Sequence, residues 1–341
     1  MPTSKDIQKT VSSLIKEIAP RNREIISRRF GLKNNKKETL ESIGRGYDIT
    51  RERVRQIEEF TLKQLSRIAD GNVDIADYVG WARNLIDSKG GVMKEKDLFK
   101  AFSGQEFDSA ANASLLFILS VDGGLVRSSE NDEFYTFWSS DAQKSDFFKN
   151  TTAALVKALE RNASVVSSDE LNSFASKNSI DNVKTCLSVS KVFGQNIFGQ
   201  VGLISWPEVK PRGVRDKAYL VLKRSNSPKH FGEIAGLIND AGFSSKRANV
   251  QTVHNELIKD SRFILVGRGM YALSEWGYST GTVKDILVDI LKKSQKPMPK
   301  AALIEKVKGA RMVKENTILL NLQDSKTFSR KEDGTYVLRK T

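Results

Sequence analysis

The chain has 341 residues, of which 39% are hydrophobic and 28% charged, a composition typical of a globular protein that folds in water. It contains no run of about eighteen apolar residues, which excludes a membrane-spanning helix. The net charge of +14 is divided unevenly, with +6 in residues 1–70, −4 in residues 71–200 and +12 in residues 201–341. Basic segments on both sides of a mildly acidic middle favour a polyanionic partner that is contacted at two places.

Cysteine and histidine are too rare to support much chemistry. Cys186 is the single cysteine, so the sequence predicts neither an internal disulfide nor a thiolate metal cluster, in agreement with a reducing interior. We expect Cys186 to be a small buried residue. His230 and His254 lie within predicted helical segments, where structural roles are expected. The sequence therefore predicts no metal, no cofactor and no enzymatic activity.

The first 70 residues predict a helix-turn-helix. A helix to about residue 18 is followed by a break at Pro20 and then by the segment "RNREIISRRFGL". Thr39 and Thr50 are suited to cap the two helices that come next, because a threonine hydroxyl accepts a hydrogen bond from the free N–H groups of a first turn. Gly46 and Tyr47 are expected to form the turn between these helices.

The helix that starts near residue 50, "TRERVRQIEEFTLKQL", has two different faces. Its apolar residues recur every three to five positions and predict a buried stripe: Val54, Ile57, Leu62 and Leu65. The opposite face carries Arg51, Glu52, Arg55 and Gln56. In a helix-turn-helix, the second helix places such side chains in the major groove, where Arg pairs with guanine, Gln with adenine and Glu with cytosine. An ordinary solvated helix face is the alternative.

The segments "REIISRRFGL", "TLESIG" and "TRERVRQIE" follow one another in an order and spacing that resemble region 4 of the bacterial sigma-70 family, the domain that binds the promoter −35 element. The resemblance covers residues 5–70. It implies that Arg51, Glu52, Arg55 and Gln56 contact bases and that Thr39 and Arg45 contact phosphates. It also implies that the first helices dock on the flap of RNA polymerase. Nothing in the chain resembles the sigma domain that melts the −10 element, so we do not expect it to start transcription alone.

The remaining 270 residues or so contain an internal repeat. Four strand-like pieces recur around Tyr135, Ile204, Tyr271 and Tyr336, at intervals of 69, 67 and 65 residues. Each is preceded by three helical segments and closes a predicted β-hairpin, which describes a winged helix. We therefore expect a mainly α protein in which a sigma region 4-like helix-turn-helix precedes four tandem winged helices. The expected domains are residues 1–71, 72–140, 141–208, 209–278 and 279–341, separated by linkers near residues 71–73, 139–145, 206–213 and 277–281.

Residues 212–278 resemble the HARE-HTH winged-helix family, which includes a domain of the RNA polymerase delta subunit. The resemblance is carried by "PKHFGEIA" and "FILVGRGMYAL". Polar and basic residues near the third helix of this module form a candidate second surface for DNA or a partner: Lys246, Arg247, Asn249, Gln251, Thr252, Asn255 and Arg268. The apolar third helix of the first module, "ANASLLFILSVD", is instead expected to pack or to bind protein, and the basic fourth module to contact the DNA backbone.

These features together predict a cytoplasmic, nucleoid-associated DNA-binding transcription factor of bacterial type. It would read a −35-like element in double-stranded DNA and associate with RNA polymerase, with no membrane and no small-molecule substrate. One alternative is a polymerase-binding accessory or anti-sigma-like protein that does not read DNA sequence. A second is the sensor of a restriction or modification system. The chain offers no carboxylate cluster and no nucleophile–base pair, which argues against this alternative.

Overall fold

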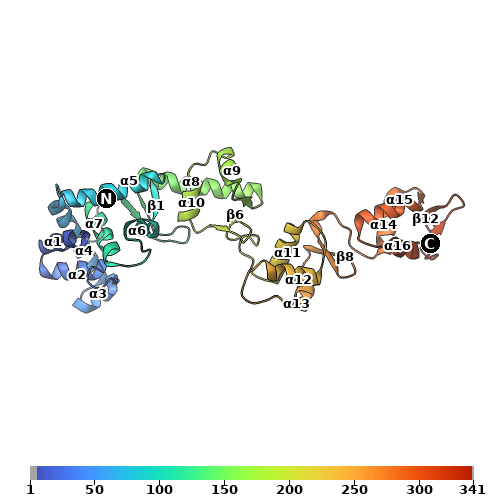
Figure 1. Ribbon diagram of the computed structural model, residues 1–341, viewed down its shortest axis with the longest axis horizontal. Helices are drawn as coiled ribbons and strands as arrows, with labels where there is room; N and C mark the ends of the chain where they lie inside the picture. The colour runs from blue at the N-terminus through green and yellow to red at the C-terminus, as the bar shows by residue number, and fades with distance from the viewer. Residues whose placement is uncertain (1–5, 340–341) are drawn as a thin grey trace. The chain divides into compact units, whose positions relative to one another are not determined.

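The computed structural model of the chain describes residues 6–339 and is mainly helical, with four small antiparallel sheets in that part of the chain (Figure 1). Two compact units divide it: Met1–Gly194 with Val201–Ile204, and Gln195–Gln200 with Ser205–Thr341. None of the helices within residues 6–339 has the length and apolar character needed to cross a membrane.

The N-terminal head consists of four helices: α1 (Ile7–Lys16), α2 (Pro20–Phe30), α3 (Leu40–Tyr47) and α4 (Arg51–Ala69). The expected break at Pro20 is confirmed, since Pro20 occupies the first position of α2, where its missing N–H costs no hydrogen bond. The helix ends at Gly31, which adopts the left-handed conformation with a φ of 72°.

After α4, one order of elements occurs four times: a helix, a short strand, two helices and a β-hairpin. We call these segments repeats 1 to 4. Repeat 1 contains α5 (Val73–Ser88), β1 (Val92–Lys94), α6 (Glu95–Ser103), α7 (Ala110–Asp122), β2 (Val126–Ser128) and β3 (Phe137–Ser139). Repeat 2 contains α8 (Ala142–Asn162), β4 (Val166–Ser167), α9 (Leu171–Lys177), α10 (Val183–Val189), β5 (Phe193–Gln195) and β6 (Gln200–Leu203).

Repeats 3 and 4 follow the same order. Repeat 3 contains α11 (Val214–Ser225), β7 (Lys229–His230), α12 (Phe231–Asp240), α13 (Val250–Lys259), β8 (Phe263–Gly267), β9 (Met270–Leu273) and a 3-10 turn, η1 (Ser274–Trp276). Repeat 4 contains α14 (Val283–Ser294), β10 (Met298–Pro299), α15 (Lys300–Ala310), α16 (Glu315–Leu322), β11 (Phe328–Arg330) and β12 (Thr335–Leu338).

The four sheets also share one strand order, in which the last strand of the repeat lies between the other two: β1-β3-β2, β4-β6-β5, β7-β9-β8 and β10-β12-β11. The short first strands were not predicted. The pairing also corrects the predicted alignment of the repeats. Phe137, Tyr271 and Tyr336 occupy equivalent positions, each paired with the third residue of its hairpin partner. Tyr135 and Ile204 lie outside the strands.

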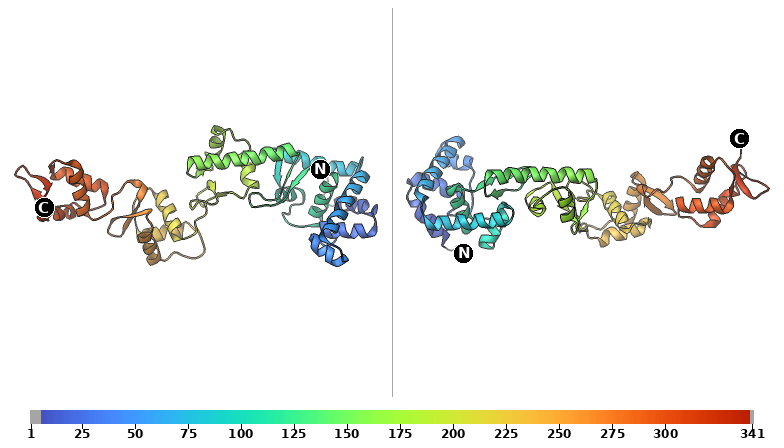
Figure 2. Two further views of the ribbon diagram at one scale, coloured as in Figure 1. Left: turned by 180° about the vertical axis from the view of Figure 1, so that it is seen from behind. Right: turned by 90° about the horizontal axis from the view of Figure 1, so that it is seen from above.

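The head and repeat 1 share one hydrophobic core. The third helix of repeat 1, α7, packs against α1, α2 and α4 as well as against α5 (Figures 1 and 2). The rings of Phe30 and Phe117 meet edge to face with centroids 5.3 Å apart. Ile7, Val11 and Leu14 on α1 belong to the same cluster. The apolar sequence of α7 is thus explained by burial on two sides, as expected for a helix that packs.

Repeat 2 joins repeat 1 through its own third helix, α10, which packs against β1. The Thr185 hydroxyl donates to the carbonyl of Lys89 (2.9 Å), and the Ser188 hydroxyl donates to the Asp97 carboxylate (3.1 Å). Two further backbone hydrogen bonds link the segment before β3 to the end of α10, from the Tyr135 N–H to the Val189 carbonyl and from the Lys191 N–H to the Glu133 carbonyl. The boundary predicted near residues 139–145 contains a short connection, since β3 ends at residue 139 and α8 begins at residue 142.

In the second compact unit, repeats 3 and 4 each have a core of their own. His230 caps α12, and its ring stacks on Phe231, which in turn stacks on His254 (centroids 4.2 and 4.3 Å apart). Both histidines are therefore structural, as predicted. In the first unit, Cys186 is buried, and this burial raises the pKa of its thiol.

Candidate nucleic-acid interface

The interface is built on α3, the turn after it and the start of α4. Each helix is capped by the threonine that the sequence indicated. The Thr39 hydroxyl accepts a hydrogen bond from the Ser42 N–H, and the Thr50 hydroxyl accepts one from the Arg53 N–H, both at 3.1 Å. These bonds satisfy free donors of the two first turns and fix where the helices begin.

The turn lies later than predicted. Gly46 and Tyr47 belong to α3, and residues 48–50 connect the helices. Asp48 ends α3 in the left-handed conformation, with a φ of 54°, and the N–H groups of Asp48 and Ile49 both donate to the carbonyl of Gly44. Asp tolerates this conformation better than most residues because its short side chain interacts locally.

A small apolar core holds the turn against α2. Ile25, Ile43 and Val54 are fully buried, one from each of the three helices. On α4 the predicted inward stripe is confirmed, with Val54 and Leu65 buried and Ile57 and Leu62 half-buried. Thr61 is also buried on this stripe, which the apolar pattern alone did not indicate.

Arginines of α2 also fix the position of the turn, through ion pairs and hydrogen bonds at the protein surface. The Arg28 guanidinium donates two hydrogen bonds to Glu38 (2.9 and 2.7 Å) and lies 5.7 Å from the centre of the Tyr47 ring. This pairing lowers the pKa of Glu38 and raises the pKa of Arg28. Arg29 pairs with Glu58 on α4 and also donates to the carbonyl of Glu38 (3.1 Å). These arginines therefore position the turn through contacts within the head.

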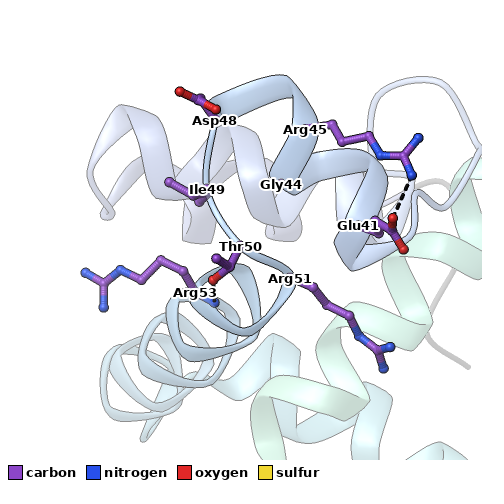
Figure 3. A pocket seen from close by; sticks show the side chains of 8 residues that line it. All are labelled: Glu41, Gly44, Arg45, Asp48, Ile49, Thr50, Arg51 and Arg53. Carbon is purple, nitrogen blue, oxygen red and sulfur yellow. Dashed lines mark hydrogen bonds and ion pairs between the residues drawn. The ribbon is translucent and has the colours of Figure 1, made fainter.

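The four predicted base-contacting residues lie together in the first two turns of α4, and all four are exposed: Arg51, Glu52, Arg55 and Gln56. A groove of about 720 Å³ runs between α3 and the start of α4. It is lined by Glu41, Gly44, Arg45, Asp48, Ile49, Thr50, Arg51 and Arg53 (Figure 3). Arg51 and Arg53 leave the helix start in opposite directions (Figure 3). A second, smaller groove of about 390 Å³ at Arg51 is also lined by Thr39 and Arg29.

The side chains of this surface already interact along the helix. Arg55 pairs with Glu52, with Nε 2.9 Å from the nearer carboxylate oxygen, and also with Glu59 one turn later. The hydrogen bond and the charge of Arg55 lower the pKa of Glu52, and the same contacts raise the pKa of Arg55. Gln56 accepts a hydrogen bond from Arg53 (3.2 Å). Within residues 6–339, the Arg51 side chain forms no hydrogen bond or ion pair.

The two predicted phosphate-contacting residues have different surroundings. The Thr39 hydroxyl is used to cap α3 and is exposed, as described above. Arg45 lies in the last turn of α3 and pairs with Glu41 across an exposed turn of helix, at 2.6 Å (Figure 3). Arg53, which the sequence analysis did not single out, lines the groove between α3 and α4 together with Arg45. It lies two residues after Arg51 and therefore on another side of the helix, so the face that Arg51 shares with Arg55 does not indicate it.

The candidate second surface lies in repeat 3, at the start of α13. Lys246 and Arg247 are exposed in the loop before the helix, and Arg268 is exposed in the β8–β9 turn. Asn249 caps α13, its side-chain oxygen accepting from two backbone N–H groups, so this oxygen is not free for a ligand. Three further residues of the set are exposed on the first turns of α13: Gln251, Thr252 and Asn255.

The family match of this chain lies in the head. Residues 14–67 match the family "Sigma-70, region 4". RNA polymerase sigma factor RpoS of Coxiella burnetii is 42% identical over 65 residues, and sigma factor SigA of Nostoc is 38% identical over 74 residues. Sigma factor RpoD of Neisseria gonorrhoeae is 37% identical over 59 residues. These stretches are 19%, 22% and 17% of this chain and span only 18%, 18% and 9% of the three relatives.

Proposed function

We propose that the protein is a DNA-binding regulator of transcription initiation that reads a −35-like promoter element through α4 and associates with RNA polymerase. The observation that carries the proposal is the exposed group Arg51, Glu52, Arg55 and Gln56 at the start of a capped second helix. Those residue types match the hydrogen-bonding edges of guanine, cytosine and adenine in the major groove. The similarity of residues 14–67 to sigma region 4 supports the same role.

The test is a selection of binding sites from random double-stranded DNA with the full chain and with Arg55→Ala. We expect one short motif to be enriched by the native protein and to be lost in the variant. Arg67→Ala is the matched control, because Arg67 is an exposed arginine on the same helix, about 18 Å further along its axis. Enrichment of the same motif by Arg55→Ala would contradict base reading by α4.

We further propose that the four repeats are winged helices and that repeat 3 is of the HARE-HTH type. The recurring order of helix, strand, two helices and hairpin supports this, as does the shared position of the last strand between the other two. The proposed domains are those expected from the sequence, with residues 1–71 as the region 4-like head. Binding of the polymerase flap by α1 is also a proposal, and it must use the polar side of α1, since Ile7, Val11 and Leu14 are buried.

The alternative function is that of a polymerase accessory or anti-sigma-like protein that does not read DNA. The ion pairs of Arg55 with Glu52 and Glu59 favour it, because this arginine must leave partners before it contacts a base. Charge reversal by Arg51→Glu with Arg55→Glu separates the two. It removes promoter binding and regulation if α4 reads DNA, and it leaves regulation and polymerase binding intact under the alternative.

A further inference from the structure

The third helices of the four repeats are covered by neighbouring residues to different extents. This covering decides which third helix is accessible to a partner. In repeat 1, α7 is covered by the head on one side and by α5 on the other. In repeat 2, α10 is fixed to repeat 1 by the hydrogen bonds of Thr185 and Ser188. The corresponding helix of repeat 4, α16, carries an exposed leucine, Leu320, and no lysine or arginine within its bounds. In repeat 3, α13 exposes the polar side chains of Gln251, Thr252 and Asn255, and two exposed cations, Lys246 and Arg247, precede it.

From these differences we propose that α13, the loop before it and the β8–β9 turn form a second surface that binds double-stranded DNA. The amides of Gln251 and Asn255 lie one turn apart on the exposed side of α13 and contact each other at 3.3 Å. Side-chain amides are suited to the donor and acceptor pair of adenine in the major groove. Lys246 and Arg247 stand at the start of the helix, where cations contact phosphate while the first turns contact bases.

The β8–β9 turn is linked to α13 through stacked rings. The carbonyl of Gly269, next to Arg268, accepts a hydrogen bond from the N–H of Phe231 (3.0 Å). The Phe231 ring stacks on His254, which is on α13 between Gln251 and Asn255 (4.3 Å between centroids). Arg268 is exposed at this turn. The turn therefore belongs to the same surface as the start of α13 and adds a third cation to it.

Near α13, several acidic residues of repeat 3 are paired while its exposed cations are not, an arrangement that favours a polyanionic ligand. Three acidic residues near α13 are paired with arginines, Glu256 with Arg215 and both Asp216 and Asp260 with Arg262, while Asp240 at the end of α12 is exposed and forms no ion pair within residues 6–339. Lys246, Arg247 and Arg268 form no ion pair within the described residues 6–339. An unpaired set of cations beside mostly paired acids favours a ligand with dense negative charge, and neutralised phosphates release counterions in proportion to the number of contacts.

The experiment measures the affinity of the full chain for random-sequence double-stranded DNA over a series of salt concentrations. The variant Lys246→Ala with Arg247→Ala is expected to bind more weakly at low salt. The slope of log affinity against log salt should become shallower by about 0.9 for each phosphate contact that is lost. Gln251→Ala is expected to leave the slope unchanged. The matched control is Lys157→Ala with Arg161→Ala, another exposed Lys and Arg pair, on α8.

The inference is overturned if the Lys246 and Arg247 variant keeps the native slope, as the control is expected to do. It is also overturned if this variant weakens the capture of purified RNA polymerase and leaves DNA binding unchanged, since the surface would then bind protein. The outcome is separate from that for α4. Loss of the selected motif in Arg55→Ala with no effect at Lys246 supports the head alone, whereas the reverse pattern supports repeat 3 alone.

Discussion

Gly44 on α3 lies so close to Ile49 that a Cβ atom at Gly44 would stand 2.6 Å from the Ile49 carbonyl oxygen. No neighbouring side chain can relieve this contact, because the opposing atom belongs to the backbone of the turn. The carbonyl of Gly44 also accepts the N–H groups of Asp48 and Ile49, which end the helix. The close approach therefore sets the angle at which α4 leaves the turn.

We expect Gly44→Ala to destabilise the helix-turn-helix by about 1–3 kcal/mol, although alanine is normally the better helix former. Amide hydrogen exchange should become faster in α3 and in the first turns of α4. Gly80→Ala on α5 is the control, since a Cβ there meets nothing within 4 Å, and it should keep or increase the local stability. Equal protection from hydrogen exchange in Gly44→Ala and Gly80→Ala would show that the turn accommodates a Cβ atom at position 44.

The pair of Arg28 and Glu38 should make the head less stable in acid. Arg28 lowers the pKa of Glu38, so the pair stabilises the fold fully above the ordinary glutamate pKa of about 4.3 and loses this effect as the pH falls further. We expect Glu38→Gln to cost about 1 kcal/mol at neutral pH and progressively less as the pH falls below the ordinary glutamate pKa. Hydrogen exchange of α3 at neutral pH and below that pKa measures this, and Glu41→Gln, at an exposed pair with Arg45, should show little change.

Phe117 tests whether the head and repeat 1 unfold together. Phe117→Ala removes the ring that meets Phe30 and should cost about 3–5 kcal/mol, because the ring is fully buried. Hydrogen exchange should rise in α1, α2 and α4 as well as in α5–α7. Phe107→Ala removes a ring that is 72% exposed and should have little effect. If exchange rises in repeat 1 alone, the shared core does not couple the two parts.

Glu59→Gln tests how far the ion pairs on α4 restrain DNA binding. The substitution frees one side of Arg55 and removes a negative charge close to the expected phosphates. We expect tighter binding to the selected site at low salt and a smaller gain at high salt, because exposed charges are screened. Fluorescence anisotropy at two salt concentrations measures the change. Glu160→Gln on α8 is the control, and equal affinities at low salt for native and Glu59→Gln protein would contradict the prediction.

Local chemistry made part of the head predictable. The caps at Thr39 and Thr50, the break at Pro20 and the inward stripe of α4 depend on neighbours a few residues away, and all were found where the sequence placed them. The turn was misplaced because Gly46 was taken as its marker. The glycine that the turn requires is Gly44, and it lies inside the helix.

Features that depend on distant partners could not be predicted in the same way. The strands β1, β4, β7 and β10 have only two or three residues, and each is defined by pairing with a strand much later in its repeat. Likewise, the apolar sequence of α7 indicated burial but not that α1, α2 and α4 provide one side of it. In the site, the sequence indicated which residues share a helix face, while the pairing of Arg55 with Glu52 and Glu59 required side-chain geometry.

The packing of α7 has a practical consequence for cutting the protein into pieces. A fragment that stops after α4 would keep the whole region matched to sigma region 4, yet it would leave Val11, Leu14 and Phe30 without the side chains that cover them. Such a fragment exposes a continuous apolar surface and is prone to aggregate. The same core includes Leu125 and Trp138, so the head is best purified together with the whole of repeat 1, through Ser139.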